Sequence, residues 1–108
     1  MMYEVSREVF KQRLEERGNF ILVHVCSTES EFSGNTFKDS LNVIWSRENP
    51  IDLDKISSNK NQNILFYSLL ENHDEARKAA ELAEANGYKF VYFYLGKAVD
   101  KILDKGLN

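Results

Sequence analysis

Three stretches of the chain are apolar almost throughout and rich in β-branched and aromatic residues: 20–26, 63–68 and 89–95. Such runs are typical of strands that are buried on both faces of a sheet. Two shorter stretches, 3–5 and 41–45, have the same character. Helix-forming segments separate these runs, and that alternation favours a parallel sheet. We therefore predict an α/β fold with about five parallel strands and helices on both faces of the sheet.

The first predicted helix follows Ser6, because a serine hydroxyl is a good N-cap, and continues to about Arg17. Gly18 is expected to end it. Short helices are also predicted within 51–58 and 97–106. The apolar stripe of the first helix consists of Val9, Phe10 and Leu14.

A longer helix is predicted to end at Gly87. Asn72 and Glu75 have the spacing of a capping box, which places the start of this helix at Asn72. Four alanines recur at helical spacing and share one face: Ala76, Ala79, Ala80 and Ala83. Because these side chains are small, we expect that face to pack closely on the sheet.

Composition narrows the classes of function. The 108 residues suit a single domain, 1–108, and the formal net charge of −3 gives no basic surface for nucleic acid or acidic membranes. No apolar run reaches the length of a membrane span, and we expect no leader peptide. One cysteine allows no internal disulfide, which favours a reduced, cytoplasmic protein. One Cys and two His have no metal-ligand spacing, so neither metal nor cofactor is expected.

Four sequence stretches, taken in order, have the frame of a known family. They read "LVHVCSTESEF" from Leu22, "GNTFKDSLNVI" from Gly34, "ILFYSLLENHDEARKAA" from Ile64 and "GYKFVYFYLGK" from Gly87. Together they resemble the rhodanese domain, a sulfurtransferase fold, over nearly the whole chain from Tyr3. The resemblance implies a three-layer fold with the strand order 1-5-4-2-3. The positions that match the family frame are Glu31, Phe32, Gly34, Asn42, Ile44, Tyr67, Ala76, Ala79 and Ala80.

The resemblance places Ser68 where a rhodanese has its catalytic cysteine. In that family a thiolate takes a sulfane sulfur from a donor, and a serine hydroxyl cannot do this because it ionises too weakly. Other family positions also differ: His24, Cys26, Asn35 and Lys97 replace an aspartate, an arginine, a histidine and a glycine. The loop that binds the anionic donor in the family corresponds here to Leu69, Leu70, Glu71, Asn72 and His73. With Glu71 and then Asp74, this loop is expected to repel anions.

Each candidate residue also has a simpler interpretation. Ser68 could be a hydrolase nucleophile with His73 and Asp74, but no nucleophile-elbow sequence surrounds it, and a hydrogen-bonding role is favoured. Cys26 ends a strand that should neighbour the strand of Ser68, so it could be a relocated thiol, although most cysteines outside disulfides are small apolar fillers. His24 shares a strand face with Cys26 and is expected to be a core histidine.

The sequence therefore indicates a rhodanese-like protein without classical activity. Its expected role is to bind a small ligand or a protein partner at the former active-site loop. The alternative is an active sulfurtransferase or persulfide carrier that uses Cys26. These two hypotheses differ in whether the chain performs covalent sulfur chemistry.

Overall fold

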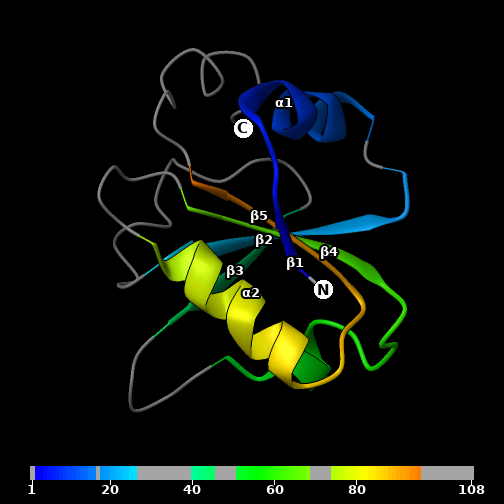
Figure 1. Ribbon diagram of the computed structural model, residues 1–108, viewed down its shortest axis with the longest axis vertical. Coiled ribbons are helices and arrows are strands. Elements are labelled where there is room, and N and C mark those ends of the chain that lie inside the picture. The colour runs from blue at the N-terminus through cyan, green and yellow to red at the C-terminus, as the bar shows by residue number, and fades with distance from the viewer. Residues whose placement is uncertain (1, 17, 27–39, 46–50, 69–73, 96–108) are drawn as a thin grey trace.

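The computed structural model describes residues 2–16, 18–26, 40–45, 51–68 and 74–95. Five parallel strands form one sheet in the order β1-β5-β4-β2-β3 (Figure 1). The predicted parallel α/β fold is confirmed, and its strand order agrees with a rhodanese-like three-layer arrangement. The strands are β1 Met2–Glu4, β2 Phe20–Cys26, β3 Leu41–Ile44, β4 Asn63–Ser68 and β5 Phe90–Leu95. The helices are α1 Arg7–Glu15, the 3-10 helix η2 Leu53–Lys55, and α2 Glu75–Ala85.

Helix α2 covers one face of the sheet with its alanines. Ala76, Ala79, Ala80 and Ala83 are all 0% exposed, as the sequence predicted. They pack with aliphatic and aromatic side chains of the central strands, including Val23, Ile64 and Phe66. Small side chains bring the helix axis close to the strands, so the packing on this face leaves little space for larger groups.

Helix α1 covers the opposite face, where aromatic rings dominate (Figure 1). Phe10 is fully buried and stacks on Tyr94 of β5, with ring centroids 4.4 Å apart and planes 9° apart. It also contacts the ring of Tyr67 of β4 at 5.2 Å. The predicted apolar stripe of α1 is wrong at Val9, whose side chain is 40% exposed. Val9 lies beside the helix face that packs Phe10 on the sheet, and not on that face.

The two helices begin in different ways. Ser6 caps α1 as predicted, with its hydroxyl accepting from the Val9 amide at 3.2 Å. The predicted capping box of α2 is wrong, because its N-cap is Asp74 rather than Asn72. The predicted helix in 97–106 lies outside the described residues.

The end of α2 is a Schellman motif at Gly87. The Tyr88 amide donates to the Ala83 carbonyl at 3.1 Å, and the Gly87 amide donates to the Glu84 carbonyl at 3.0 Å. Gly87 has a φ of 90°, a conformation that glycine adopts without strain. Tyr88 follows it into the core, and its hydroxyl donates to the backbone oxygens of Leu53, at 3.3 Å, and Ser57. This motif therefore fixes the path from α2 into β5.

Candidate functional site

The carboxyl ends of β2, β4 and β5 meet at one edge of the sheet, and Ser68 lies there. Ser68 is the last residue of central strand β4, pairs with Leu95 of β5, and is 3% exposed. In parallel α/β proteins this edge is where ligands bind. Along β4, Leu65 and Tyr67 belong to the cluster under α1, while Ile64 and Phe66 pack under α2. By alternation, the Ser68 side chain points toward the α2 face.

The loop of residues 69–73 follows Ser68 and lies outside the described residues. The binding role of Leu69, Leu70, Glu71, Asn72 and His73 therefore stays a prediction. The less favoured alternative, a hydrolase that pairs Ser68 with His73, also involves a residue outside the described part of the chain. The next described residue is Asp74, which directly precedes α2.

The carboxylate of Asp74 is neutralised by two cations of the first turn of α2. Its Oδ2 lies 2.5 Å from an Arg77 guanidinium nitrogen, and its Oδ1 lies 3.4 Å from Lys78 Nζ. The hydrogen bond from Arg77 lowers the pKa of Asp74, with a further contribution from Lys78. Asp74 is thus charged at neutral pH, but its partners compensate that charge. The expected repulsion of anions by Asp74 is therefore weaker than the sequence indicated.

Cys26 ends β2, the strand beside β4, as predicted. Its position relative to Ser68 is nevertheless different from that of a substitute nucleophile. Cys26 shares a strand face with Leu22, which lies in the cluster under α1, whereas Ser68 points toward α2. The thiol and the hydroxyl therefore lie at the same edge of the sheet but on opposite faces of it.

Cys26 is part of a buried polar cluster with His24. Its Sγ lies 3.4 Å from His24 Nε2 and 3.6 Å from Nδ1. Both residues are almost fully buried, with Cys26 0% and His24 2% exposed. The imidazole stacks on the Tyr67 ring, with centroids 5.0 Å apart and planes 6° apart. The predicted near-core position of His24 is confirmed.

A third member of this cluster comes from β3. Asn42 is paired in register with His24, and its Oδ1 lies 3.2 Å from His24 Nδ1. Sequence reasoning matched Asn42 to the family frame but gave it no function. The available signal was its position in a short strand that was expected beside β2, where a polar side chain reaches its neighbour across the sheet. A thiol, an imidazole and an amide oxygen thus lie close together.

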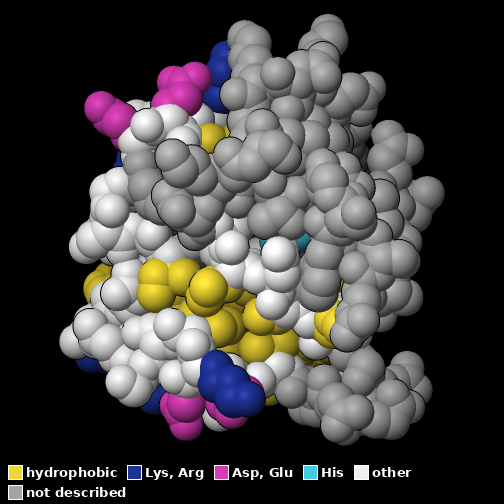
Figure 2. Space-filling model, turned by 180° about the vertical axis from the view of Figure 1, so that it is seen from behind, with side chains coloured by type: hydrophobic (Ala, Val, Ile, Leu, Met, Phe, Trp, Pro, Cys, Tyr) yellow, Lys and Arg dark blue, Asp and Glu magenta, His cyan; other side chains and the backbone are white. Residues whose placement is uncertain are grey.

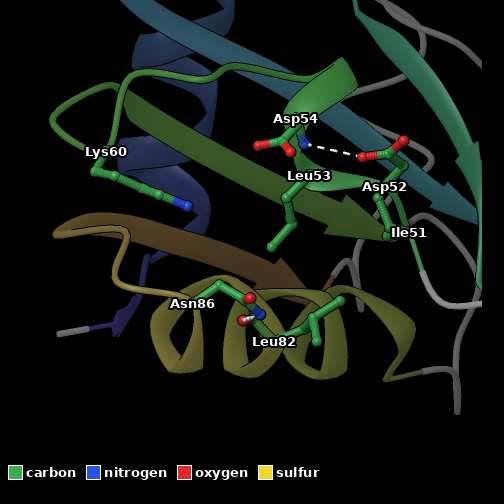
Figure 3. A pocket seen from close by; sticks show the side chains of 7 residues that line it. All are labelled: Ile51, Asp52, Leu53, Asp54, Lys60, Leu82 and Asn86. Atoms are coloured by element: carbon green, nitrogen blue, oxygen red, sulfur yellow. Dashed lines mark hydrogen bonds between the residues drawn. The ribbon is translucent and has the colours of Figure 1, made fainter.

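Described residues line two hollows on the surface of the molecule. One hollow of about 310 Å³ lies between η2 and the C-terminal end of α2, lined by Ile51, Asp52, Leu53, Asp54, Lys60, Leu82 and Asn86. Figure 3 shows Lys60 and Leu53 reaching toward the α2 side chains from the segment before β4. Because this segment precedes the strand, the hollow lies near the start of β4, at the edge opposite Ser68.

The second hollow, of about 380 Å³, runs along β3. It is lined by the four β3 residues Leu41, Asn42, Val43 and Ile44, and by Ile51, Asp52, Lys55 and Ile56. Two of these, Leu41 and Ile44, are exposed hydrophobic side chains. Figure 2 shows an exposed hydrophobic patch on the face of the molecule turned away in Figure 1. Three of the residues that line this hollow, Val43, Ile51 and Ile56, pack in the core under α2.

Two further findings concern the described part of the chain. It contains no group of three or more His, Cys, Asp and Glu side chains that could hold a metal ion. Among the helices of these same residues, none is long and apolar enough to cross a membrane.

Comparison by sequence finds no matching family model and no matching curated protein. Comparison of structures finds similarity to the crystal structure of the Alr3790 protein from Anabaena sp., with a TM-score of 0.58 and 19% sequence identity. The similarity covers 92% of this chain and 85% of the Anabaena chain. At this identity the similarity bears on the fold alone.

Proposed function

We propose that this chain is a rhodanese-like domain that has lost classical sulfurtransferase chemistry and acts in the cytoplasm by binding a ligand or partner. The binding site is the carboxyl edge of the sheet, at Ser68 and the 69–73 loop. One observation carries the proposal: Ser68 ends the central strand at the position where the resembling family has its nucleophile. An oxygen nucleophile cannot carry sulfane sulfur at neutral pH, because its hydroxyl does not ionise there.

The test is a thiosulfate:cyanide sulfurtransferase assay on the native chain. We expect no turnover, because position 68 has no thiol. Ser68→Cys should restore little activity, since Glu71 stays in the loop and no loop arginine replaces the family's anion-binding group. A Ser68→Cys variant as active as a normal rhodanese would show that loop charge is not the obstacle.

Binding can be followed separately through Trp45, the one tryptophan in the chain. Its backbone amide donates to the Cys26 carbonyl at 2.7 Å, and its side chain packs against the core under α2, the face toward which Ser68 points. We expect thiosulfate to leave Trp45 fluorescence unchanged in the native chain. A saturable change would mean that the edge still recognises the anionic donor, and the proposed loss of classical function would then be wrong.

A second function, a persulfide carrier at Cys26, is favoured by the contact between Cys26 Sγ and His24. The thiolate would attack the outer sulfur of thiosulfate, the S–S bond would break, and sulfite would leave with the bonding electrons. The thiol proton would be released to solvent. Mass spectrometry after exposure to thiosulfate tests this: one added sulfur on the native chain, absent from Cys26→Ser, would support the carrier. An unmodified native chain would exclude it.

A further inference from the structure

We propose that the open edge of β3 binds the same edge of a second copy of this chain, so that two sheets join through an antiparallel strand pair across a two-fold axis. β3 is the last strand at its end of the described sheet, where it pairs only with β2. Neither Ser68 nor sulfur chemistry enters this inference, which therefore holds or fails independently of the proposed function.

The main chain of β3 has a side that no described strand covers. The Trp45 amide donates to the Cys26 carbonyl at 2.7 Å, so by alternation Val43 also bonds to β2. The amides and carbonyls of Asn42 and Ile44 then point away from β2. Main-chain groups at a strand edge are a template for another extended chain. The chemistry that this edge recognises is therefore that of a β-strand.

The side chains of β3 do not block such pairing. The strand reads LNVI, without the charged residue or proline that commonly protects a sheet edge. By contrast, the strand at the other end of the sheet, β1, has three residues and ends at the exposed Glu4. Leu41 and Ile44 of β3 are 41% and 38% exposed. Pairing at this edge would remove part of that apolar area from water, which is favourable.

A second copy fits this edge because one antiparallel register is self-complementary. With the two-fold axis at Val43, Asn42 of one copy lies opposite Ile44 of the other, and the Ile44 amide donates to the Asn42 carbonyl. A carbonyl oxygen accepts two hydrogen bonds, so this bond is compatible with other contacts of Asn42. Val43 and Trp45 pack toward α2, and Leu41 shares their face by alternation. On that face Leu41 lies opposite Trp45 of the second copy, and cross-strand pairs of this kind stabilise a sheet.

The hollow beside β3 extends this surface. It has a volume of about 380 Å³, adjoins all of β3, and its lining includes Asp52 and Lys55. One carboxylate and one ammonium group can face their own copies without net repulsion, whereas a lining of one sign could not. An edge of four residues is nevertheless a small interface, so we expect a reversible dimer whose population rises with protein concentration.

The first test is the mass in solution, measured by sedimentation over a wide range of protein concentration. We expect it to rise from the 12.5 kDa of one chain to twice that value and to stop there, because a two-fold contact uses the edge of both copies. Ile44→Pro removes the outward amide and leaves the hydrogen bonds to β2 intact, and proline is tolerated at such an edge position. The two-fold axis doubles the loss, so the dissociation constant should rise at least about tenfold. Ile44→Val keeps the amide and is the matched control.

A second variant keeps the test valid if circular dichroism shows that Ile44→Pro is unfolded. Leu41 is exposed in the single chain, so Leu41→Lys should leave the fold intact and weaken the dimer, because its charge would face the indole of Trp45.

Cross-linking tests the register. Under oxidation by diamide, Val43→Cys should form a disulfide-linked dimer, because the two copies of this residue lie opposite each other at the axis. Leu41→Cys is more exposed but should not cross-link, since its two copies lie at opposite ends of the strand pair. The native chain is the blank, because Cys26 is buried.

A chain that stays monomeric at every concentration would overturn the proposal. So would growth beyond a dimer, or a dimer that neither Ile44→Pro nor Leu41→Lys weakens. Cross-linking of Leu41→Cys but not of Val43→Cys would overturn the two-fold register. None of these results bears on the sulfurtransferase assay, so the proposed function and this inference can fail separately.

Discussion

The two faces of the sheet are covered by different kinds of side chain. Under α2, four alanines without exposed area meet aliphatic and aromatic strand residues such as Ile64 and Phe66. Under α1, a few large rings fill the space, and a thiol and an imidazole are buried with them. Apart from Ser68 at the end of β4, the described side chains of the central strands under α2 are apolar, whereas the core under α1 consists of a few large rings with two polar side chains among them.

This difference shows where chemistry can be placed in a small domain. Close alanine packing over the middle of the strands leaves little volume for a polar side chain and its partners, and Ser68 lies at the end of its strand. Large aromatic rings leave more space between them. The imidazole of His24 stacks there on the Tyr67 ring and makes a hydrogen bond with Asn42. Along the strands the alanine face therefore holds the fold together and the aromatic face buries polar groups, while Ser68 lies on the alanine side only at the carboxyl end of β4. The predictions below test this division.

The largest effect is expected on the aromatic face. Phe10→Ala removes a fully buried ring that contacts both Tyr67 and Tyr94, and should lower the free energy of unfolding by about 3–5 kcal/mol. Val9→Ala is the matched control in the same helix, where an exposed side chain should matter by less than about 0.5 kcal/mol. Urea denaturation measures both. Equal losses for the two variants would mean that α1 does not depend on Phe10.

On the alanine face, the vulnerable change is an increase in size. Ala80→Leu should overpack the interface and lower the free energy of unfolding by about 1–3 kcal/mol. Glu81→Leu, on the exposed side of the helix, loses an ion pair with Arg77 and should change the free energy of unfolding by no more than about 0.5 kcal/mol. Urea melts again give the comparison. If Ala80→Leu unfolds like the parent, the interface under α2 has more room than its alanines indicate.

The end of α2 tests backbone conformation without a packing change. A Cβ at Gly87 would meet nothing within 4 Å, so Gly87→Ala costs only the strain of its positive φ, about 1–2 kcal/mol. Gly87→Asn should lose less, because asparagine tolerates this conformation better. Thermal denaturation ranks the three chains. An order with asparagine below alanine would contradict the backbone explanation.

The smallest effect is expected at the start of α2, and it depends on pH. Arg77 lowers the pKa of Asp74 below its ordinary 3.8, so the carboxylate stabilises the folded chain above that pH. The contribution is lost as the pH falls through the lower, folded pKa. Asp74→Asn should therefore narrow the stability difference between pH 7 and pH 3 slightly, and added salt should weaken the effect. Urea midpoints at both pH values measure it; a larger pH dependence in Asp74→Asn would contradict this sign.

The sheet could be predicted closely because burial dominates its sequence. The bounds of β2 and β4 match the apolar runs 20–26 and 63–68, since strands covered on both faces need apolar residues at every position. The alanine face of α2 followed from spacing alone. The start of α2 did not, because Asn72 and Asp74 are both good caps and local sequence gives little ground to choose between them.

The polar cluster was only partly predictable. Strand alternation put His24 and Cys26 on one face, and the structure brings their side chains into contact. Asn42 was missed as a partner because its contact depends on the register between β2 and β3, which a single sequence does not state. Ser68 and Cys26 were expected near one another. The register between β2 and β4 pairs His24 with Tyr67, and it therefore puts the Cys26 and Ser68 side chains on opposite faces of the sheet.

The place of β1 in the sheet has a consequence for how the chain folds. β1 comes first in the sequence but pairs with β5, from Met2 beside Val91 to Glu4 beside Phe93. During synthesis the first strand must wait until almost all the described chain has left the ribosome. β2, β3 and β4 can associate earlier, since they are neighbours that emerge together. Closing a loop this long is slow, so the arrival of β5 is expected to be the late step that completes the domain.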